Sequence, residues 1–155
     1  MCLVIASREG RRVASVDSGR AYLNADRKES DSEEIVMEIE PFLVSMQSKV
    51  ARKWFVPLVD AVSGKLYVKV EKALYGTLDA ARIWYDKITG VLLSMGYTQN
   101  VVDKCVFNKL VDGVQVTIML YVDDLLATCI DGRLTHRASG GAEEGFPWGC
   151  QVLYG

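Results

Sequence analysis

The sequence predicts an α+β domain in which an antiparallel sheet is backed by helices. Several short segments alternate apolar and polar residues, one longer segment has helical periodicity, and an Asp-Gly pair separates two alternating segments. Half of the 155 residues are hydrophobic and a quarter are charged, which is typical of a globular protein with a sizeable core.

The first half of the chain contains three expected strands. RRVASVD (11–17) alternates, contains β-branched residues and ends at Asp17. EEIVMEIE (33–40) follows an acidic, turn-like stretch. Residues 41–64 are ambiguous, since PFLVSMQSKVARKW is compatible with a helix and DAVSGK predicts a turn. KLYVKVEKALYG (65–76) alternates again and stops at a glycine.

The clearest expected helix covers residues 77–95, and Gly96 is placed to end it. Apolar residues recur along it at steps of four and three: Trp84, Ile88, Val91 and Met95. This stripe predicts that the helix buries one face, with Trp84 in the core.

The second half of the chain predicts a hairpin. KCVFNKLV (104–111) and VQVTIMLYV (114–122) flank the Asp-Gly pair, which favours a type I′ turn between alternating strands. We expect Cys105 and Phe107 to be core residues of the first strand. LLATCI (125–130) continues as a further strand.

Composition restricts the partners and the compartment. A net charge of −2 gives no broad basic surface, so a nucleic-acid partner would be held by local patches or by other parts of a longer protein. The four cysteines form no CxxC pair and no zinc pattern, which favours cytosolic thiols. No signal peptide is evident, and no run approaches the roughly 20 apolar residues that span a bilayer. We expect an intracellular, soluble protein without a membrane partner.

Asp123 and Asp124 interrupt the apolar stretch TIMLYVDDLLATC. Burying one unpaired carboxylate there costs roughly several kcal/mol. In a continuous strand the two side chains would point to opposite faces, whereas at a hairpin apex both approach one site. The pair is therefore either a solvated turn or a set of carboxylates neutralised by divalent cations, for which Mg²⁺ is suited.

Asp17 favours the cation interpretation, because it is the last residue of the other well-defined expected strand, residues 11–17. If the two strands are neighbours, Asp17 and Asp123 bracket one metal pair, and we expect them to lie close together. Two ions about 3.5–4 Å apart stabilise the attacking and leaving oxygens of a phosphoryl displacement. Three acids without a histidine cluster thus favour phosphoryl or nucleotidyl transfer. The alternative for Asp17 is a helix N-cap.

Four segments in order carry a family resemblance: SVDSGRAYLNA (15–25), ALYGTLDAARIWYDKI (73–88), GYTQNVVDKCVF (96–107) and LYVDDLLA (120–127). Together they resemble the reverse transcriptase of copia-type retrotransposons, over roughly residues 5–130. Tyr-Val-Asp-Asp alone is a weak signal, whereas the collinear set is specific.

The resemblance implies a polymerase palm, a ferredoxin-like βαββαβ antiparallel sheet with partial fingers, that performs RNA-directed DNA synthesis. Asp17 and Asp123 would ligate two Mg²⁺ ions, with Mn²⁺ as a substitute, and Asp124 would assist nearby. An RNA or DNA template-primer and deoxynucleoside triphosphates would be the substrates.

The resemblance also implies nucleotide-binding roles for Ala21, Tyr22 and Gly76, and Arg20, which departs from the family pattern, is a further candidate. Tyr22 matches an aromatic position beneath the incoming sugar that selects deoxynucleotides; the alternative is a half-buried structural tyrosine. Gly76 matches a loop that lets the backbone approach nucleotide or template, which is compatible with a turn glycine. Arg20 would meet a triphosphate or lie exposed.

The chain departs from the family pattern in three places. Ser18, Gly19 and Arg20 stand where the family commonly has a lysine or a small residue after the first aspartate. Thr77, Leu78 and Asp79 stand where the family has Leu-Lys-Gln, and the added carboxylate is expected to repel phosphates. Residues 1–130 would form the palm and partial fingers, whereas the glycine-rich residues 131–155 would be a disordered or aberrant, frameshifted tail. The palm-closing strand, the thumb and the RNase H and integrase regions of a Pol polyprotein would lie elsewhere.

Two alternatives stay open. The chain is either a polymerase fragment or a catalytically inactive remnant with at most weak nucleic-acid binding. A nucleotidyl cyclase shares the paired acids, but the spacing of Tyr22 and Gly76 speaks against it. For a polymerase, the expected location is a cytoplasmic particle or the nucleus.

Overall fold

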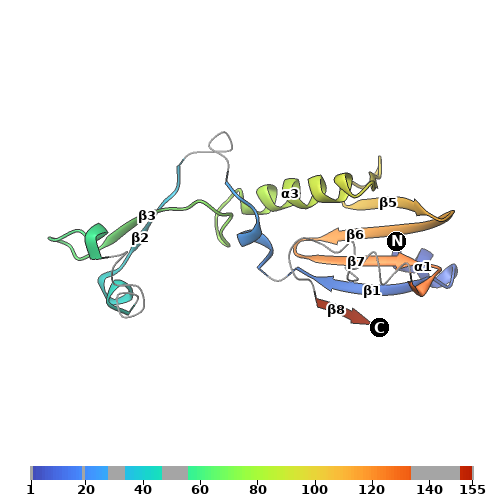
Figure 1. Cartoon of the computed structure of the whole chain (residues 1–155), viewed down its shortest axis with the longest axis horizontal. Helices are drawn as coiled ribbons and strands as arrows, with labels where there is room; N and C mark the ends of the chain where they lie inside the picture. The colour runs from blue at the N-terminus through green and yellow to red at the C-terminus, as the bar shows by residue number, and fades with distance from the viewer. Residues whose placement is uncertain (1, 19, 28–33, 47–55, 134–150, 155) are drawn as a thin grey trace.

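The computed structural model of the protein describes residues 2–18, 20–27, 34–46, 56–133 and 151–154. Within these residues the main sheet has six strands, all paired antiparallel, in the order β4-β5-β6-β7-β1-β8 (Figure 1). The strands are β1 (Arg12–Asp17), β4 (Thr98–Gln99), β5 (Val106–Val111), β6 (Val114–Tyr121), β7 (Asp124–Cys129) and β8 (Gln151–Tyr154).

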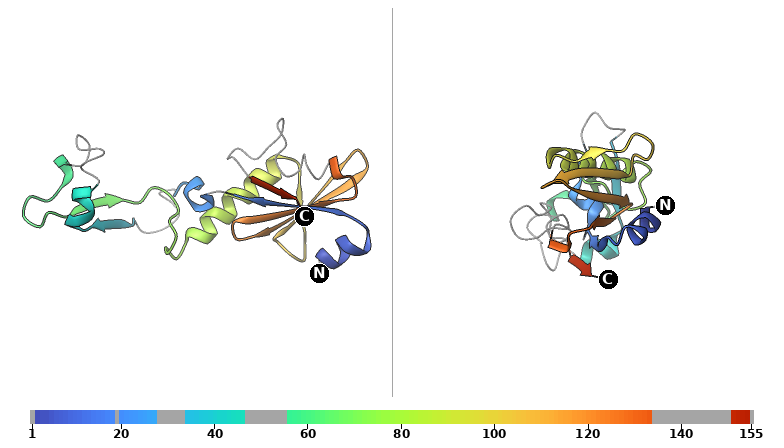
Figure 2. Two further views of the ribbon diagram at one scale, coloured as in Figure 1. Left: turned by 90° about the horizontal axis from the view of Figure 1, so that it is seen from below. Right: turned by 90° about the vertical axis from the view of Figure 1, so that its right-hand side faces the viewer.

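Helix α3 (Ala80–Ser94) packs on one face of this sheet (Figure 2). Its apolar stripe meets alternate residues of the strands, because side chains two apart share a sheet face. The fully buried members of this core include Trp84, Ile88, Leu92, Phe107, Ile118, Leu125 and Cys129. The predicted helix is confirmed with shorter bounds, and its stripe is confirmed at Trp84 and Ile88. Val91 and Met95 are only partly buried, and Leu92 is the buried residue at that end of the helix.

The connection of the strands explains why α3 covers that face. Strand β1 runs antiparallel to β7, which runs antiparallel to β6, so β1 and β6 are parallel with β7 between them. Helix α3 lies between β1 and β6 along the chain. This is a split β-α-β arrangement, in which the crossover helix packs on the sheet.

The Asp112-Gly113 turn joins β5 to β6 as predicted. Val111 pairs with Val114, and both turn residues have positive φ, 51° and 79°, which defines type I′. Phe107 is buried as expected, but the expectation for Cys105 is wrong, because this thiol is exposed. Strand β5 begins only at Val106, so Cys105 still belongs to the preceding turn.

A second, smaller unit extends from the main sheet as an arm (Figure 1). Its two strands, β2 (Val36–Ile39) and β3 (Leu66–Lys69), pair antiparallel. Residues 41–46 are helical, and η2 (Val56–Leu58) adds a 3₁₀ turn. The expected strands at 33–40 and 65–76 are therefore present but shorter.

The arm has a small core and a two-stranded base. Ile39, Val44 and Leu66 form its buried cluster. At the base, the backbone N–H of Ala73 donates to the Ala25 carbonyl at 2.9 Å, and residues 26 and 72 form a β-bridge. Two antiparallel chain segments thus connect the arm to the sheet.

One α-helix and two strands of the described residues were not predicted: α1 (Cys2–Arg8), β4 and β8. Strand β8 pairs with β1, so this part of the expected unstructured tail is a strand; residues 134–150 and 155 of that tail lie outside the described residues. In the described part of the chain, no helix is long and apolar enough to cross a membrane.

Candidate active site

The fold brings the three predicted acidic residues to one end of the neighbouring strands β1 and β7. Strand β6 ends at Tyr121 and β7 begins at Asp124, so Val122 and Asp123 form a two-residue turn. In the neighbouring pair of strands, Asp17 is the register partner of Asp124. The backbone N–H of Ser18 reaches the Asp123 carbonyl oxygen at 3.4 Å. The tight-turn alternative is the one observed.

The turn holds a valine in an unfavourable conformation. Val122 has φ 56°, and Asp123 is not among the positive-φ residues, which is the pattern of a type II′ turn. A β-branched residue in this region is a genuine outlier, and such strain costs about 1–3 kcal/mol. It persists only where surrounding contacts impose it.

Two aromatic side chains supply such contacts. The Trp84 indole Nε1 donates to the Val122 carbonyl oxygen at 2.7 Å, from a side chain that is 1% exposed. The Tyr75 hydroxyl donates to Asp123 Oδ2 at 3.2 Å. The turn is therefore held by helix α3, by the loop before it and by the residue that follows β1.

Tyr22 lies beneath Tyr75. Its ring is buried, 7% exposed, and meets the ring of the exposed Tyr75 edge to face with centroids 4.1 Å apart. Ala21 is wholly buried in the same core. Both belong to the short 3₁₀ turn η1 (Ala21–Asn24), which packs against α3. The burial favours a supporting role for Ala21, and Tyr22 contacts the exposed Tyr75 ring.

Arg20 and Gly76 lie at exposed turns. Arg20 has φ 60° and ψ 36°, an unusual left-handed conformation for a side chain of this size. Gly76 has φ 94°, and a Cβ added there would meet nothing within 4 Å. Its glycine is therefore required by the backbone conformation, and the space above it is open to a ligand.

The expected repulsion from Asp79 is modified by a partner. Asp79 Oδ1 accepts a 2.6 Å hydrogen bond from Arg27, and the two side chains are only 16% and 7% exposed. This ion pair joins the base of the arm to the residue preceding α3. Beside it on the arm, a hydrogen bond from Lys72 holds the pKa of Asp26 below its usual value. The Asp79 charge is thus compensated within the chain.

Carboxylates are the expected ligands of a divalent cation, and the backbone register sets two of these acids next to each other. Two acids occupy directly opposite ladder positions, where like charges are destabilising unless a cation compensates them. Asp124 also borders a cavity of about 490 Å³ on the sheet face opposite α3, with Ser15 and Tyr121. Among the side chains that the structure describes, no group of three or more metal-ligating residues is found.

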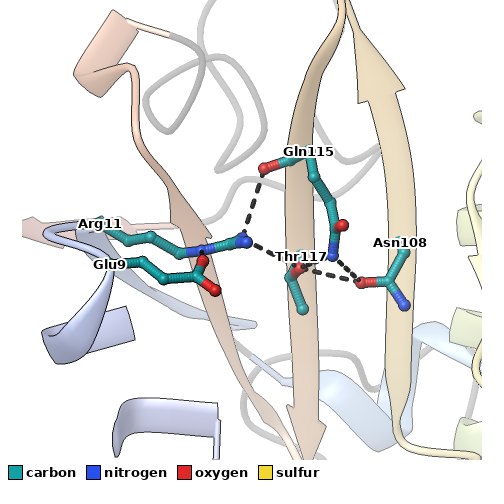
Figure 3. Close-up of polar contacts among 5 residues, drawn as sticks. All are labelled: Glu9, Arg11, Asn108, Gln115 and Thr117. Carbon is teal, nitrogen blue, oxygen red and sulfur yellow. Dashed lines mark hydrogen bonds and ion pairs between the residues drawn. The ribbon is translucent and has the colours of Figure 1, made fainter. Parts of the chain in front are cut away.

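A polar cluster lies at the other end of the same face (Figure 3). Arg11, whose side chain is 10% exposed, donates to Glu9 at 2.7 Å and to the Thr117 hydroxyl at 3.4 Å. Thr117 donates to Asn108 at 2.9 Å, and the Gln115 amide donates to both Asn108 and Thr117. These contacts satisfy buried polar groups, including Thr117 at 8% exposure, and serve the packing of the sheet.

Comparison with known proteins defines the class. Residues 1–136 match the family "Reverse transcriptase (RNA-dependent DNA polymerase)". The chain belongs to this family, and the predicted resemblance to copia-type elements is confirmed.

Two curated relatives are Pol polyproteins of plant transposons. The chain is 41% identical over 70 residues to the retrovirus-related Pol polyprotein from transposon RE1 of Arabidopsis thaliana, a match over 44% of this chain and 5% of the relative. It is 33% identical over 88 residues to that from transposon TNT 1-94 of Nicotiana tabacum, over 55% of this chain and 7% of the relative. The chain thus spans a small part of these relatives. No solved structure matches it.

Two contacts of the site were not predicted from the sequence. Tyr75 was part of a family motif, but nothing in its spacing indicated that its hydroxyl reaches Asp123, 48 positions away. Trp84 was expected as a core residue, and its burial confirms that; its bond to the turn, 38 positions away, was not anticipated. A buried tryptophan needs a partner for its N–H, and this was the available signal.

Proposed function

We propose that this chain carries the catalytic palm of an RNA-directed DNA polymerase, with Asp17, Asp123 and Asp124 as the acids of a two-cation site. The observation that carries the proposal is the register that sets Asp17 opposite Asp124, beside a tight turn bearing Asp123. The split β-α-β arrangement, with an antiparallel strand on either side of β1, agrees with a ferredoxin-like palm.

Bound Mg²⁺, or Mn²⁺ in its place, would activate the primer 3′-hydroxyl and stabilise the pyrophosphate leaving group. Asp17, Asp123 and Asp124 would hold the ions through carboxylate oxygens. Tyr75 donates a hydrogen bond to one Asp123 oxygen, which leaves the other oxygen for a ligand.

The nucleotide would lie over the surface formed by Arg20, Tyr75 and Gly76. Arg20 is exposed and offers a guanidinium for phosphate oxygens. The open space at Gly76 admits a ligand close to the backbone. Tyr22 supports Tyr75 from below, so both rings define the floor on which a deoxyribose would rest.

The arm would act as partial fingers, and the nucleic-acid partner would be a template-primer. With a net charge of −2, most of the grip on phosphates would come from other regions of a Pol polyprotein, including RNase H and integrase. The proposed location is inside the cell, in a cytoplasmic particle or the nucleus, where template and deoxynucleotides meet.

Primer extension tests this proposal. The purified chain is incubated with a poly(rA)–oligo(dT) template-primer, dTTP and Mg²⁺ or Mn²⁺. We expect extension that Asp123→Asn lowers at least about a hundredfold, because several kcal/mol of charge stabilisation is lost. Asp86→Asn, at an exposed acid of α3 outside the site, is the matched control and should leave extension unchanged.

The outcomes separate the candidates. Extension that depends on Asp123 but not on Asp86 supports the polymerase. No extension by the wild-type chain with either cation, while it remains folded, supports the inactive remnant. Formation of a cyclic nucleotide from a ribonucleoside triphosphate would point to a cyclase.

A further inference from the structure

We infer that Trp84 is a positioning residue for the Val122–Asp123 turn, and that its indole N–H sets the orientation of the Asp123 carboxylate. The inference rests on the proposed function for its catalytic consequence, but its structural part stands on the observed contacts. Trp84 is the residue of α3 whose side chain joins the centre of the core to the backbone of the turn.

The need for positioning arises from Val122. A valine with φ 56° is strained, and an isolated two-residue turn would prefer a residue such as glycine there. The 2.7 Å bond from Trp84 Nε1 holds the Val122 carbonyl in this conformation. Without the donor, the turn would relax, and Asp123, the next residue, would change its direction.

The position of the donor is fixed by packing. Trp84 is 1% exposed and lies among Ile83, Ile88 and residues of three strands in one hydrophobic cluster. An indole so enclosed has few alternative rotamers, so its N–H is held in place before any ligand binds. Preorganised groups of this kind keep a site within the narrow geometry that chemistry requires.

The other two contacts do not replace it. The Ser18 N–H reaches the Asp123 carbonyl at a longer 3.4 Å, and Tyr75 holds the carboxylate from an exposed loop position. Both of these contacts are made to Asp123 and not to the Val122 carbonyl. Trp84 therefore acts on the strained residue itself, and the effect of removing its N–H should be largest in the turn.

The test uses Trp84→Phe, which keeps an aromatic ring and removes the donor. Tyr85→Phe is the matched control: it removes a 3.0 Å bond from the adjacent aromatic residue of α3 to the Lys104 carbonyl, outside the turn. The readouts are amide hydrogen exchange of residues 120–126 without metal, Mn²⁺ affinity by calorimetry, and primer extension. Thermal denaturation of each variant checks that it is folded.

In Trp84→Phe we expect exchange in residues 120–126 to rise about tenfold and Mn²⁺ to bind about tenfold more weakly, the scale of one lost hydrogen bond. Tyr85→Phe should change both less than twofold, roughly the scatter of neutral substitutions. Adding Val122→Gly to Trp84→Phe should recover part of both losses, because glycine adopts positive φ without strain.

Three results would overturn the inference. These are unchanged exchange in Trp84→Phe, equal effects of Tyr85→Phe and Trp84→Phe on the turn, and no recovery on adding Val122→Gly. If the wild-type chain neither binds Mn²⁺ nor extends primers, the proposed function fails, while the exchange measurements still decide the role of Trp84 in the turn.

Discussion

The ion pair between Arg27 and Asp79 should contribute strongly to stability. Arg27 Nη1 lies 2.6 Å from Asp79 Oδ1, and the Arg27 and Asp79 side chains are 7% and 16% exposed. Arg27→Met keeps much of the aliphatic packing but leaves the Asp79 carboxylate without its guanidinium. The perturbation therefore tests whether this contact fastens the arm to the start of α3.

The expected magnitude follows from burial. Removing one partner of a buried pair costs about 3–5 kcal/mol because an uncompensated charge remains. Since Asp79 retains some solvent contact, we expect Arg27→Met to lower the free energy of unfolding by an amount near the lower limit, about 3 kcal/mol. For a chain of this size that corresponds to a fall in Tm of roughly 6–12 °C.

Thermal and urea denaturation measure the effect in a double-mutant cycle with Asp79→Asn. The double variant should lose only about 1 kcal/mol of unfolding free energy, because no unpaired charge is left. Asp79→Asn alone leaves Arg27 unpaired and should also be destabilised, so the coupling free energy is at least about 2 kcal/mol. Arg82→Ala is the control: the Arg82–Asp86 pair on the same helix is 49% and 61% exposed, and its loss should change stability by less than about 0.5 kcal/mol.

The reasoning is refuted by either of two results. One is a loss in Arg27→Met no larger than that in Arg82→Ala. The other is the same loss in the wild-type and Asp79→Asn backgrounds, which would show that Arg27 acts through some contact other than Asp79.

Further substitutions test the packing and the turns. Ser18→Ala should raise the free energy of unfolding by about 1 kcal/mol in urea denaturation, because the Ser18 hydroxyl is buried and has no partner among the described residues. In the same assay Gly90→Ala, inside α3 with open space for a Cβ, should stabilise by about 0.5–1 kcal/mol, whereas Gly113→Ala, at φ 79°, should destabilise by about 1 kcal/mol. A hydrogen bond from Lys65 holds the pKa of Glu38 below its usual value, so this contact stabilises the arm above the usual glutamate pKa and is lost as the pH falls through the lowered one. Lys65→Met should return the Glu38 pKa toward its usual value, as measured by a carboxyl NMR titration.

Each of these predictions has a contrary result. A lower free energy of unfolding in Ser18→Ala would contradict the first prediction, because it would mean that the hydroxyl has a favourable contact. Equal effects of alanine at Gly90 and Gly113 would show that φ is not what distinguishes the two positions. An unchanged Glu38 titration in Lys65→Met would show that another group lowers the pKa.

The elements predicted correctly are those specified by local sequence. The Asp112-Gly113 turn follows from two residues that tolerate positive φ. Helix α3 follows from the spacing of its apolar residues, of which Trp84 and Ile88 are buried in the core. Strand β1 ends at Asp17 as expected. The alternation of apolar and polar residues in RRVASVD was the local signal for this strand. The acids lie together at one end of the strands because β1 pairs with β7.

The features that were missed depend on contacts between distant segments. Helix α1 buries only Ala6, and β8 pairs with β1, which lies more than 130 positions earlier in the chain. The Arg27–Asp79 pair joins residues 52 positions apart. The strained Val122 is equally invisible locally, because its conformation is imposed by Trp84 and the neighbouring strands.

A cation site built by Asp17, Asp123 and Asp124 is tested most directly by isothermal titration of Mn²⁺ into the folded wild-type chain and into the three single Asp→Asn variants. We predict saturable binding by the wild type and an affinity at least about tenfold weaker in each variant, because each removes a charged oxygen ligand. Binding that is absent in the wild type, or equal in all four proteins, would contradict the proposed site.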